Sequence, residues 1–500
     1  MVEVASSTQV QLFRLCIGYL MPHTNRMDPE EFRRYGKQLV DWIADYLQHA
    51  ERYPVLSQVR PGDIKKQLPP GPPSQGQSME QIFRDFESIV LPGITHWNHP
   101  SFFAYFSISG SPPGILAELL SAALNVNGML WKTSPAATEL EEVVLDWLRQ
   151  MLGLPADFEG VITDTASVSS LLAIAAAREA LHQRIREEGM SGRSDLPRLR
   201  LYCSEHAHSS IEKGAITVGI GQTGVRKIPV DQEFRLRPDL LRDAIREDRA
   251  AGYLPFCAVA TVGTTSTTSI DPVPEIAEIC ASEGLWLHVD GAYGGVAAIV
   301  PNRQNILRGC DRADSIVVNP HKWLMTPIDC SAFYVRKPEI LRQAFSLVPE
   351  YLRTSEEDVK NYMDYGVQLG RRFRALKLWF VIRSYGVEGL RNHITEGCRL
   401  AQKFSDWVDE HPAFERLAPV PFSVVCFRYR PPGHLDESAL QRLNERLLEA
   451  VNATGEVFLS HTKLGDRYTL RLAVGNQATQ ERHVARAWEL LTSEASGLSS

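Results

Sequence analysis

The decisive stretch of this sequence is residues 256–290, which reads Phe256-Cys-Ala-Val-Ala-Thr-Val262, then Val273-Pro-Glu-Ile-Ala-Glu-Ile-Cys-Ala-Ser282, then Leu285-Trp-Leu-His-Val-Asp290. The first and last segments are short apolar runs typical of buried strands, and the middle one has helical character. Strand, helix and strand in this order predict a parallel strand pair joined by a crossover helix.

The same alternation continues on both sides of that stretch. Residues 315–319 and 330–335 are further strand candidates, and the apolar residues that follow Ser134-Pro135 recur at helical spacing, namely Leu140, Val143, Val144, Trp147, Leu148 and Met151. The chain is therefore expected to be an α/β protein with a mostly parallel central sheet and helices on both faces. Such sheets bind ligands at the carboxyl ends of their strands.

The two ends of the chain have a different character. A helix is expected from Asp28, where an N-cap aspartate precedes Pro29, and residues 68–76 form a connecting segment rich in proline and glycine. Strands near 422–428 and 468–474 and a helix near 479–491 predict a smaller α+β domain. We expect an N-terminal extension (1–26), an arm (27–111), a large domain (112–379) and a small domain (380–500).

Composition excludes several classes of function. The 53 basic and 60 acidic residues give a net charge of −7 without a basic stripe, so neither nucleic acid nor a membrane surface is an expected partner. The apolar run Leu15 to Met21 is far shorter than the ~20 residues of a membrane span. Glu3 precedes the first basic residue, Arg14, which is unlike a secretory signal. The eight cysteines are dispersed, and a cytoplasmic location is expected.

Lys322 carries the strongest chemical signal. It stands in Ser315-Ile-Val-Val-Asn-Pro-His-Lys-Trp-Leu324, directly after a predicted buried strand. A loop lysine usually extends to solvent. Alternatively, a desolvated amine has a lowered pKa and a free lone pair, as Schiff-base chemistry with pyridoxal phosphate requires.

Asp290 ends another apolar strand and is followed by small residues. It could cap the following helix, or its carboxylate could pair with a cation such as a protonated pyridine nitrogen. Ala292 could then pack flat against a ring.

Two further segments could complete such a site. Residues 160–172 pass from a strand through Thr165, Ala166 and Ser167 into a helix, which is either a plain serine cap or a phosphate site at a helix start. His206 and His208 follow a strand; no third ligand stands at a metal-binding spacing, so no metal site is expected and a role in stacking on a cofactor is favoured for His208. Gly219–Gly224 satisfies GxGxxG, but a strand pattern follows it, so a dinucleotide site is not supported.

Taken together, these segments resemble the aromatic-L-amino-acid decarboxylases, a family of group II pyridoxal-phosphate-dependent decarboxylases. The resemblance extends from about Met27 to the C-terminal helix and includes eight motifs in order: residues 92–100, 102–106, 134–140, 206–210, 260–265, 288–293, 319–323 and 369–373. It implies the aspartate-aminotransferase fold (fold type I) and an obligate homodimer with shared active sites and an arm over the partner.

The resemblance also implies residue roles. Lys322 would hold pyridoxal 5'-phosphate, Asp290 would pair with its ring nitrogen, and His208 and Ala292 would lie against the two ring faces. Further cofactor contacts are implied for Thr165, Ala166, Ser167, Thr265, Asn319 and His321. Tyr351, in the segment that matches the mobile catalytic loop, would return a proton to the substrate Cα. In related aldehyde synthases a phenylalanine stands here, so Tyr351 favours an amine product.

The substrate pocket departs most from the family pattern. Trp97, Tyr105 and Phe106 form an aromatic wall that suits a ring-bearing side chain. Ile108 stands where animal enzymes have a threonine near the catechol hydroxyls, and Met129 replaces a usual phenylalanine. Gln368 falls where plant relatives carry glycine or serine. Phenylalanine, tyrosine, tryptophan and dopa all remain open as substrates of an enzyme that would release CO2 and an arylalkylamine.

Three alternatives stay open. An aromatic acetaldehyde synthase would produce aldehyde and peroxide. A decarboxylase of acidic amino acids would need an anion-binding side chain in place of the aromatic wall. A cofactor-free interaction protein would use the strand-end residues only as caps and core.

Overall fold

The computed structural model describes residues 27–106, 108–347 and 359–498. Within them the chain forms two compact units. One comprises the described residues up to Tyr53 together with Ser57–Thr95, and the other comprises Pro54–Leu56 and the residues from His96 onward. Tyr351 lies outside the described residues.

The first unit is helical and contains α2 (Pro29–Gln48), α3 (Asp63–Gln67) and α4 (Met79–Asp85). Asp28 caps α2 as expected, because its carboxylate accepts the backbone N–H groups of Glu30 and Glu31 at 2.8 Å each. Trp42 of α2 packs edge-on against Phe86, with ring centroids 5.4 Å apart.

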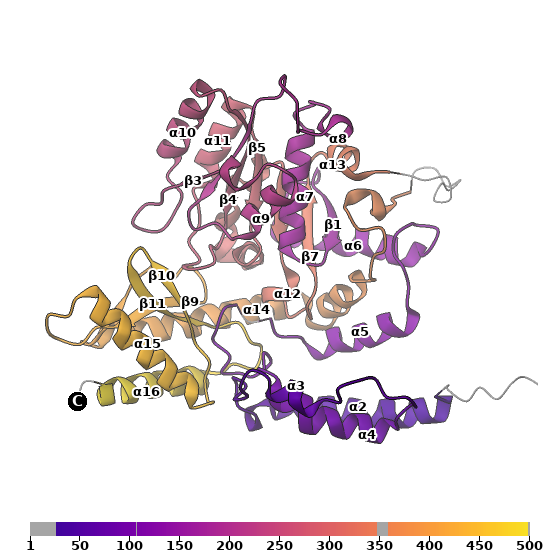
Figure 1. Cartoon of the computed structure of the whole chain (residues 1–500), viewed down its shortest axis with the longest axis vertical. Coiled ribbons are helices and arrows are strands. Elements are labelled where there is room, and N and C mark those ends of the chain that lie inside the picture. The colour runs from indigo at the N-terminus through magenta and orange to yellow at the C-terminus, as the bar shows by residue number, and fades with distance from the viewer. Residues whose placement is uncertain (1–26, 107, 348–358, 499–500) are drawn as a thin grey trace, which may run out of the picture. The chain divides into compact units, whose positions relative to one another are not determined.

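The second unit contains a seven-stranded sheet in the order β1-β7-β6-β5-β4-β2-β3 (Figure 1). The five strands from β6 to β3 are parallel, and β7 is antiparallel to both β6 and β1. The expected mostly parallel α/β sheet is therefore confirmed. Its strands are β1 (Glu159–Thr163), β2 (Leu199–Ser204), β3 (Val225–Ile228), β4 (Leu254–Thr261), β5 (Trp286–Asp290), β6 (Ser315–Val318) and β7 (Ser331–Val335).

Helices cover both faces of this sheet, so the central strands are buried along their whole length. In Figure 1, α10 and α11 lie at one side of the strands, and α7, α8 and α13 lie at the other. The helices are α5 (Pro112–Leu124), α6 (Pro135–Leu152), α7 (Ala166–Glu179), α8 (Ile185–Glu188), α9 (Ser210–Thr217), α10 (Pro238–Ala250), α11 (Val273–Glu283), α12 (Pro320–Trp323) and α13 (Pro338–Phe345).

A smaller antiparallel sheet follows, in the order β10-β11-β9-β8, with its own hydrophobic core. Its elements are β8 (Phe414–Arg416), β9 (Val424–Tyr429), α15 (Glu437–Ala453), β10 (Ser460–Leu464), β11 (Arg467–Ala473) and α16 (Glu481–Leu498). The expected C-terminal α+β arrangement is confirmed. The boundary proposed at residues 379 and 380 falls within α14 (Ala375–Glu410), six residues before a kink at Gly386, whose φ of 63° suits glycine.

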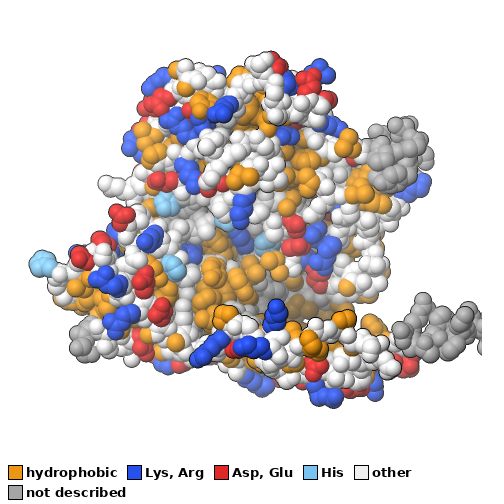
Figure 2. Space-filling view, in the orientation of Figure 1, with side chains coloured by type: hydrophobic (Ala, Val, Ile, Leu, Met, Phe, Trp, Pro, Cys, Tyr) orange, Lys and Arg blue, Asp and Glu red, His pale blue; other side chains and the backbone are white. Residues whose placement is uncertain are grey.

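The surface and the thiols have simple properties. Figure 2 shows basic and acidic side chains intermixed over the visible face of the large sheet's helices. No described helix is both long and apolar enough to cross a bilayer. The seven described cysteines are unpaired and buried, and burial raises the pKa of each thiol, to about 12 for Cys203, Cys280 and Cys330 and to about 11 for Cys398 and Cys426.

Candidate active site

The candidate site lies at the carboxyl ends of β4, β5 and β6. Parallel pairing sets Asp290, the last residue of β5, opposite Thr261 of β4 and Val317 of β6. Two residues beyond Val317 the chain leaves the sheet at Asn319 and enters the short helix α12, which carries Lys322. The expectation that chemistry-bearing residues gather at this edge is therefore met by Asp290 and Lys322.

Lys322 has its amine in a desolvated position. Burial lowers the pKa of this amine, and the negative charge of Asp290 acts in the opposite direction. The amine nitrogen lies over the ring of Phe106, 5.1 Å from its centroid. Phe106 in turn stacks on Tyr293, with centroids 4.0 Å apart. The amine thus faces an aromatic surface, and burial is the cause that lowers its pKa.

Asp290 supplies a buried negative charge. It is only 5% exposed, and its Oδ1 accepts the backbone N–H of Ala292 at 3.1 Å. Its charge acts to raise the pKa of both Lys322 and His208. A buried carboxylate beside two basic groups whose pKa values are lowered is suited to pairing with a cation between strand ends.

His208 follows β2 and is fixed by Ser210, whose hydroxyl lies 2.8 Å from Nδ1 and whose backbone N–H donates to the same atom at 3.2 Å. The residue remains exposed, yet its imidazole is enclosed enough for burial to lower its pKa. The charge of Asp290 opposes this shift, and the charge of Lys322 adds to it. The imidazole is therefore predominantly neutral at pH 7 and can lie against a flat group without adding charge.

The start of α7 carries Thr165, Ala166 and Ser167. Thr165 is the N-cap, and its backbone N–H and hydroxyl both donate to Oδ1 of Asp164, at 2.5 and 3.1 Å. The other carboxylate oxygen of Asp164 accepts the side-chain amide of Gln368 at 3.3 Å. Asp164 thus has local partners, and Gln368 is held at the residue that precedes the N-cap of α7.

A buried chain of hydroxyl groups joins this turn to Asn319. It runs from Thr163 to Ser169 at 2.8 Å, from Ser169 to Ser331 at 3.0 Å, and from Ser331 to Oδ1 of Asn319 at 2.7 Å. His321 is also buried, which lowers its pKa to about 4, and its Nδ1 accepts the backbone N–H of Cys330 at 2.9 Å. Ser169 and Ser331 were not recognised in the sequence, since isolated serines carry no pattern.

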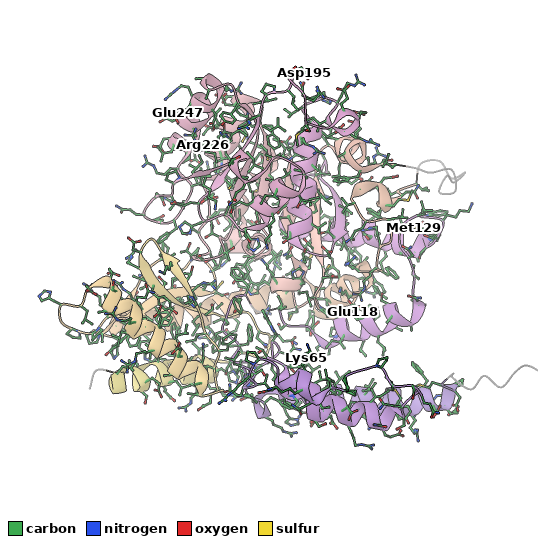
Figure 3. The ribbon with its side chains drawn as sticks, viewed as in Figure 1. Lys65, Glu118, Met129, Asp195, Arg226 and Glu247 are labelled. Carbon is green, nitrogen blue, oxygen red and sulfur yellow. The ribbon has the colours of Figure 1, made fainter. Side chains whose placement is uncertain are left out.

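The residues of the predicted aromatic wall stack on different neighbours. Trp97 stacks on Phe102 at 4.3 Å and on Tyr105 at 5.9 Å, whereas Phe106 stacks on Tyr293. Ile108 is half-buried. Met129 contacts another cluster, formed with Leu130 and Met363, and Figure 3 shows it beside the start of α6.

Ala292 and Thr265 each accept a hydrogen bond through the backbone carbonyl. Ala292 is buried after Asp290, and its carbonyl accepts the backbone N–H of Asn319 at 3.1 Å. Thr265 is exposed in the loop after β4, and its carbonyl accepts Nη2 of Arg471 at 2.8 Å. Arg471, an arginine within the apolar strand β11, was missed in the sequence. Its position inside a buried run was the signal that could have revealed it.

The site at this sheet edge is built around a desolvated lysine and a buried aspartate, and known proteins with a similar sequence identify the family. Residues 61–430 match the model of the pyridoxal-dependent decarboxylase conserved domain. The chain is 42% identical to tyrosine decarboxylase 3 of Petroselinum crispum, with 95% of this chain and 93% of that protein covered. It is 41% identical to a phenylacetaldehyde synthase of Petunia hybrida, with 96% and 97% covered.

A solved structure agrees with these matches. The Oryza sativa enzyme named TDC, determined with PLP and tryptamine, superposes with a TM-score of 0.91 at 38% identity, covering 96% of this chain and 99% of that one. The chain belongs to the pyridoxal-dependent decarboxylase family. The resemblance noted in the sequence and the fold that it implied are thereby confirmed, and pyridoxal phosphate is the cofactor of this family.

Proposed function

We propose that this protein converts an aromatic L-amino acid into the corresponding arylalkylamine and CO2. The observation that carries the proposal is the desolvated amine of Lys322, which lies over an aromatic ring and interacts with the buried charge of Asp290. Similarity to a tyrosine decarboxylase, and to a rice enzyme solved with tryptamine, supports an aromatic substrate. Phenylalanine, tyrosine, tryptophan and dopa are the substrates to test.

The residues at the sheet edge fit pyridoxal 5'-phosphate. Lys322 has the lowered amine pKa that covalent attachment requires, and Asp290 has a buried charge that suits a protonated ring nitrogen. His208 and Ala292 would lie against the ring, with Thr265 beside it. The phosphate would be held at the start of α7 and at the end of the hydroxyl chain, by Thr165, Ala166, Ser167, Asn319 and His321.

Pyridoxal phosphate, when bound, supplies an electron sink for the pair of electrons released as CO2 leaves. The chain's own residues would set the conditions for this step. Asp290 would pair with the ring nitrogen, and neutral His208 would contact the substrate carboxylate without pairing its charge. Phe106 would exclude water from the amine of Lys322.

The side chains proposed for substrate recognition are mostly apolar. Trp97, Tyr105 and Phe106 would enclose an aromatic ring, and Ile108 offers no hydrogen bond to a catechol hydroxyl. Met129 and Gln368 are proposed to complete the pocket.

We also propose that the protein is a homodimer with shared active sites. Four leucines on one face of α5 are exposed although they are large and apolar: Leu116 at 50%, Leu119 at 54%, Leu120 at 46% and Leu124 at 60%. Their spacing places them on one side of the helix, and such a patch is typical of an interface. Met129, which follows α5 and contacts a cluster away from Phe106, would then serve the partner's site.

We propose an arm over residues 27–111, a large domain over 112–379 and a small domain from 380. The unpaired, buried cysteines support a reducing compartment such as the cytoplasm.

A decarboxylation screen over the four aromatic amino acids and glutamate tests the function. Product identity and oxygen uptake are measured together, and we expect amine and CO2 without matching oxygen consumption. Activity on glutamate alone would refute the aromatic assignment. Protein without cofactor absorbance, unchanged by Lys322→Ala, would favour an interaction protein.

An aromatic acetaldehyde synthase is the second candidate, favoured by the 41% identity to a phenylacetaldehyde synthase. Tyr351 supports the amine product, because we propose that its hydroxyl returns a proton to Cα. In Tyr351→Phe this donor is absent, so aldehyde, peroxide and oxygen uptake are expected to replace most of the amine. Chromatography of the products and an oxygen electrode measure the change, with Tyr365→Phe as a matched control. An unchanged amine yield in Tyr351→Phe would contradict the proposed proton donor.

A further inference from the structure

Arg471 is a buried cation in an unusual environment. It lies on β11 of the small sheet, is only 4% exposed, and burial lowers the pKa of its guanidinium. Within the described ranges it forms no ion pair with a carboxylate, and the ionisable groups that act on its pKa are Cys426 and Tyr293. Burying a charge without a counterion costs folding free energy, so we expect other contacts of the guanidinium to offset that cost.

The guanidinium is held by neutral acceptors, most of them on one loop. Nε donates to the carbonyl of Ser266 at 2.9 Å, and Nη2 donates to the carbonyl of Thr265 at 2.8 Å. Nη1 donates to the hydroxyl of Ser460 at 3.2 Å. The hydroxyl of Ser266 also lies 2.9 Å from that of Thr462 on β10. The loop after β4 is therefore fastened to the small sheet.

The same guanidinium lies over Phe106, with Cζ 5.5 Å from the ring centroid. The amine of Lys322 lies over that ring as well, at 5.1 Å. The ring of Phe106 thus contacts both Arg471 of the small sheet and Lys322, which follows β6 of the large sheet. A planar, delocalised guanidinium suits both a ring face and a pair of carbonyls.

We propose that Arg471 is a positioning residue of the active site, which holds the backbone at Thr265 and the ring of Phe106 in register with Lys322. This inference rests on the proposed function. It makes the small sheet part of the catalytic machinery, since Arg471 joins β11 to two walls of the lysine's surroundings. Positioning errors of about 1 Å at an active site lower rates by about 100-fold.

Arg471 is not suited to anchoring the substrate carboxylate. Three of its five N–H groups already donate to Thr265, Ser266 and Ser460, so the side-on fork of Nε and Nη2 is occupied and only one N–H on each Nη is left. An ion pair with the carboxylate would also stabilise the ground state more than the transition state, because that charge is lost as CO2 departs. A guanidinium that donates to uncharged protein acceptors, and not to the substrate carboxylate, is therefore compatible with decarboxylation.

The experiment compares Arg471→Lys with Arg428→Lys in the full chain. Arg428 is a matched control, since it is equally buried on the neighbouring strand β9 but pairs with Glu415 and Glu437. Measured quantities are the cofactor Kd of the stripped protein by fluorescence quenching, its thermal midpoint, kcat and KM for the amino acid, and Ki for the amine product. Thr462→Val, which removes one hydrogen bond to the same loop, serves as a milder second variant.

We expect Arg471→Lys to raise the cofactor Kd about 10-fold and to lower kcat about 30-fold, with KM and Ki changed less than about threefold. Thr462→Val should raise the cofactor Kd about threefold, and Arg428→Lys should leave Kd and kcat within about twofold of wild type even if its thermal midpoint falls. Equal effects of the two lysine variants on Kd and kcat would overturn the inference. A raised KM with an unchanged Ki would overturn it in favour of a carboxylate anchor. Wild-type protein that binds no cofactor would refute the proposed function as well.

Discussion

The residues assigned to the cofactor and those assigned to the substrate come from different kinds of backbone. Asp290 ends the paired strand β5, Asn319 follows the paired strand β6, and Lys322 lies in the short helix after it, so the register of the sheet fixes their relative positions. Trp97 and Met129 lie on connecting segments and contact different clusters. The proposed cofactor residues are therefore positioned by the register of the sheet, whereas the proposed substrate residues are positioned by connecting segments.

The largest effect is expected on the sheet-edge side. Lys322→Ala removes the amine that lies over Phe106, so decarboxylation should fall by more than about 1000-fold and bound-cofactor absorbance should be lost. Rates and visible spectra measure this, with the exposed lysine variant Lys463→Ala as control. Retention of a tenth of the activity would remove Lys322 from its central place.

Asp290→Asn keeps the shape of the side chain and removes its charge. We expect a loss in kcat of about 100-fold, the magnitude typical of a lost preorganised electrostatic contact. Because Asp290 acts to raise the pKa of His208, that pKa should fall further in the variant, as measured by NMR titration.

The control for Asp290→Asn is Asp314→Asn. Asp314 is a carboxylate near the opposite end of the strands, where it accepts the backbone N–H of Leu287 at 2.8 Å. A similar loss of kcat in both variants would indicate a structural effect in place of a local one.

The stability of the cofactor-free protein in acid tests whether the imidazole of His321 is buried and neutral. His321 has a pKa of about 4 when folded, against about 6.5 for an unfolded histidine, so its contribution is present above pH 6.5 and is lost as the pH falls toward 4. When the pH falls from 6.5 to 4.5, the free energy of unfolding should decrease by about 2–3 kcal/mol more in wild type than in His321→Asn. Denaturant titrations measure this, with the exposed His461→Asn as control. Equal pH slopes for His321→Asn and wild type would contradict the neutral, buried state.

The smallest effect is expected on the substrate side. Ile108→Thr adds a hydroxyl near the proposed ring site, so kcat/KM for dopa relative to phenylalanine should rise about three- to tenfold, as one added hydrogen bond allows. Competition assays with both amino acids measure the ratio, and Ile108→Val controls for side-chain volume. A ratio that Ile108→Thr leaves unchanged would place Ile108 away from the substrate ring.

Local sequence patterns predicted much of the fold because each depends on neighbouring residues. The strand-helix-strand run from 256 to 290 became β4, α11 and β5, and Asp28 capped α2. The helix after Ser134 was also correct, but its buried face was placed about one residue away. Val143 is 42% exposed, whereas Leu145 and Glu141 are buried, because Glu141 pairs with Arg371 at 2.6 Å.

The rest of the site depends on partners far apart in the chain. Ser169 and Ser331 are 162 residues apart, and Arg471 reaches a carbonyl 205 residues earlier at Ser266. No spacing rule along a single sequence links such pairs. Lys322 and Asp290 could be singled out because a charged group at the end of an apolar strand is conspicuous in itself.

Burial of the thiols has a consequence for chemical durability. The thiolate is the form that peroxide attacks, and burial raises the pKa of all seven described cysteines, so very little thiolate exists at neutral pH. An enzyme of this family that released occasional hydrogen peroxide from its own turnover would find few of these sulfur atoms open to damage. The apolar packing that buries these cysteines thereby also limits their oxidation.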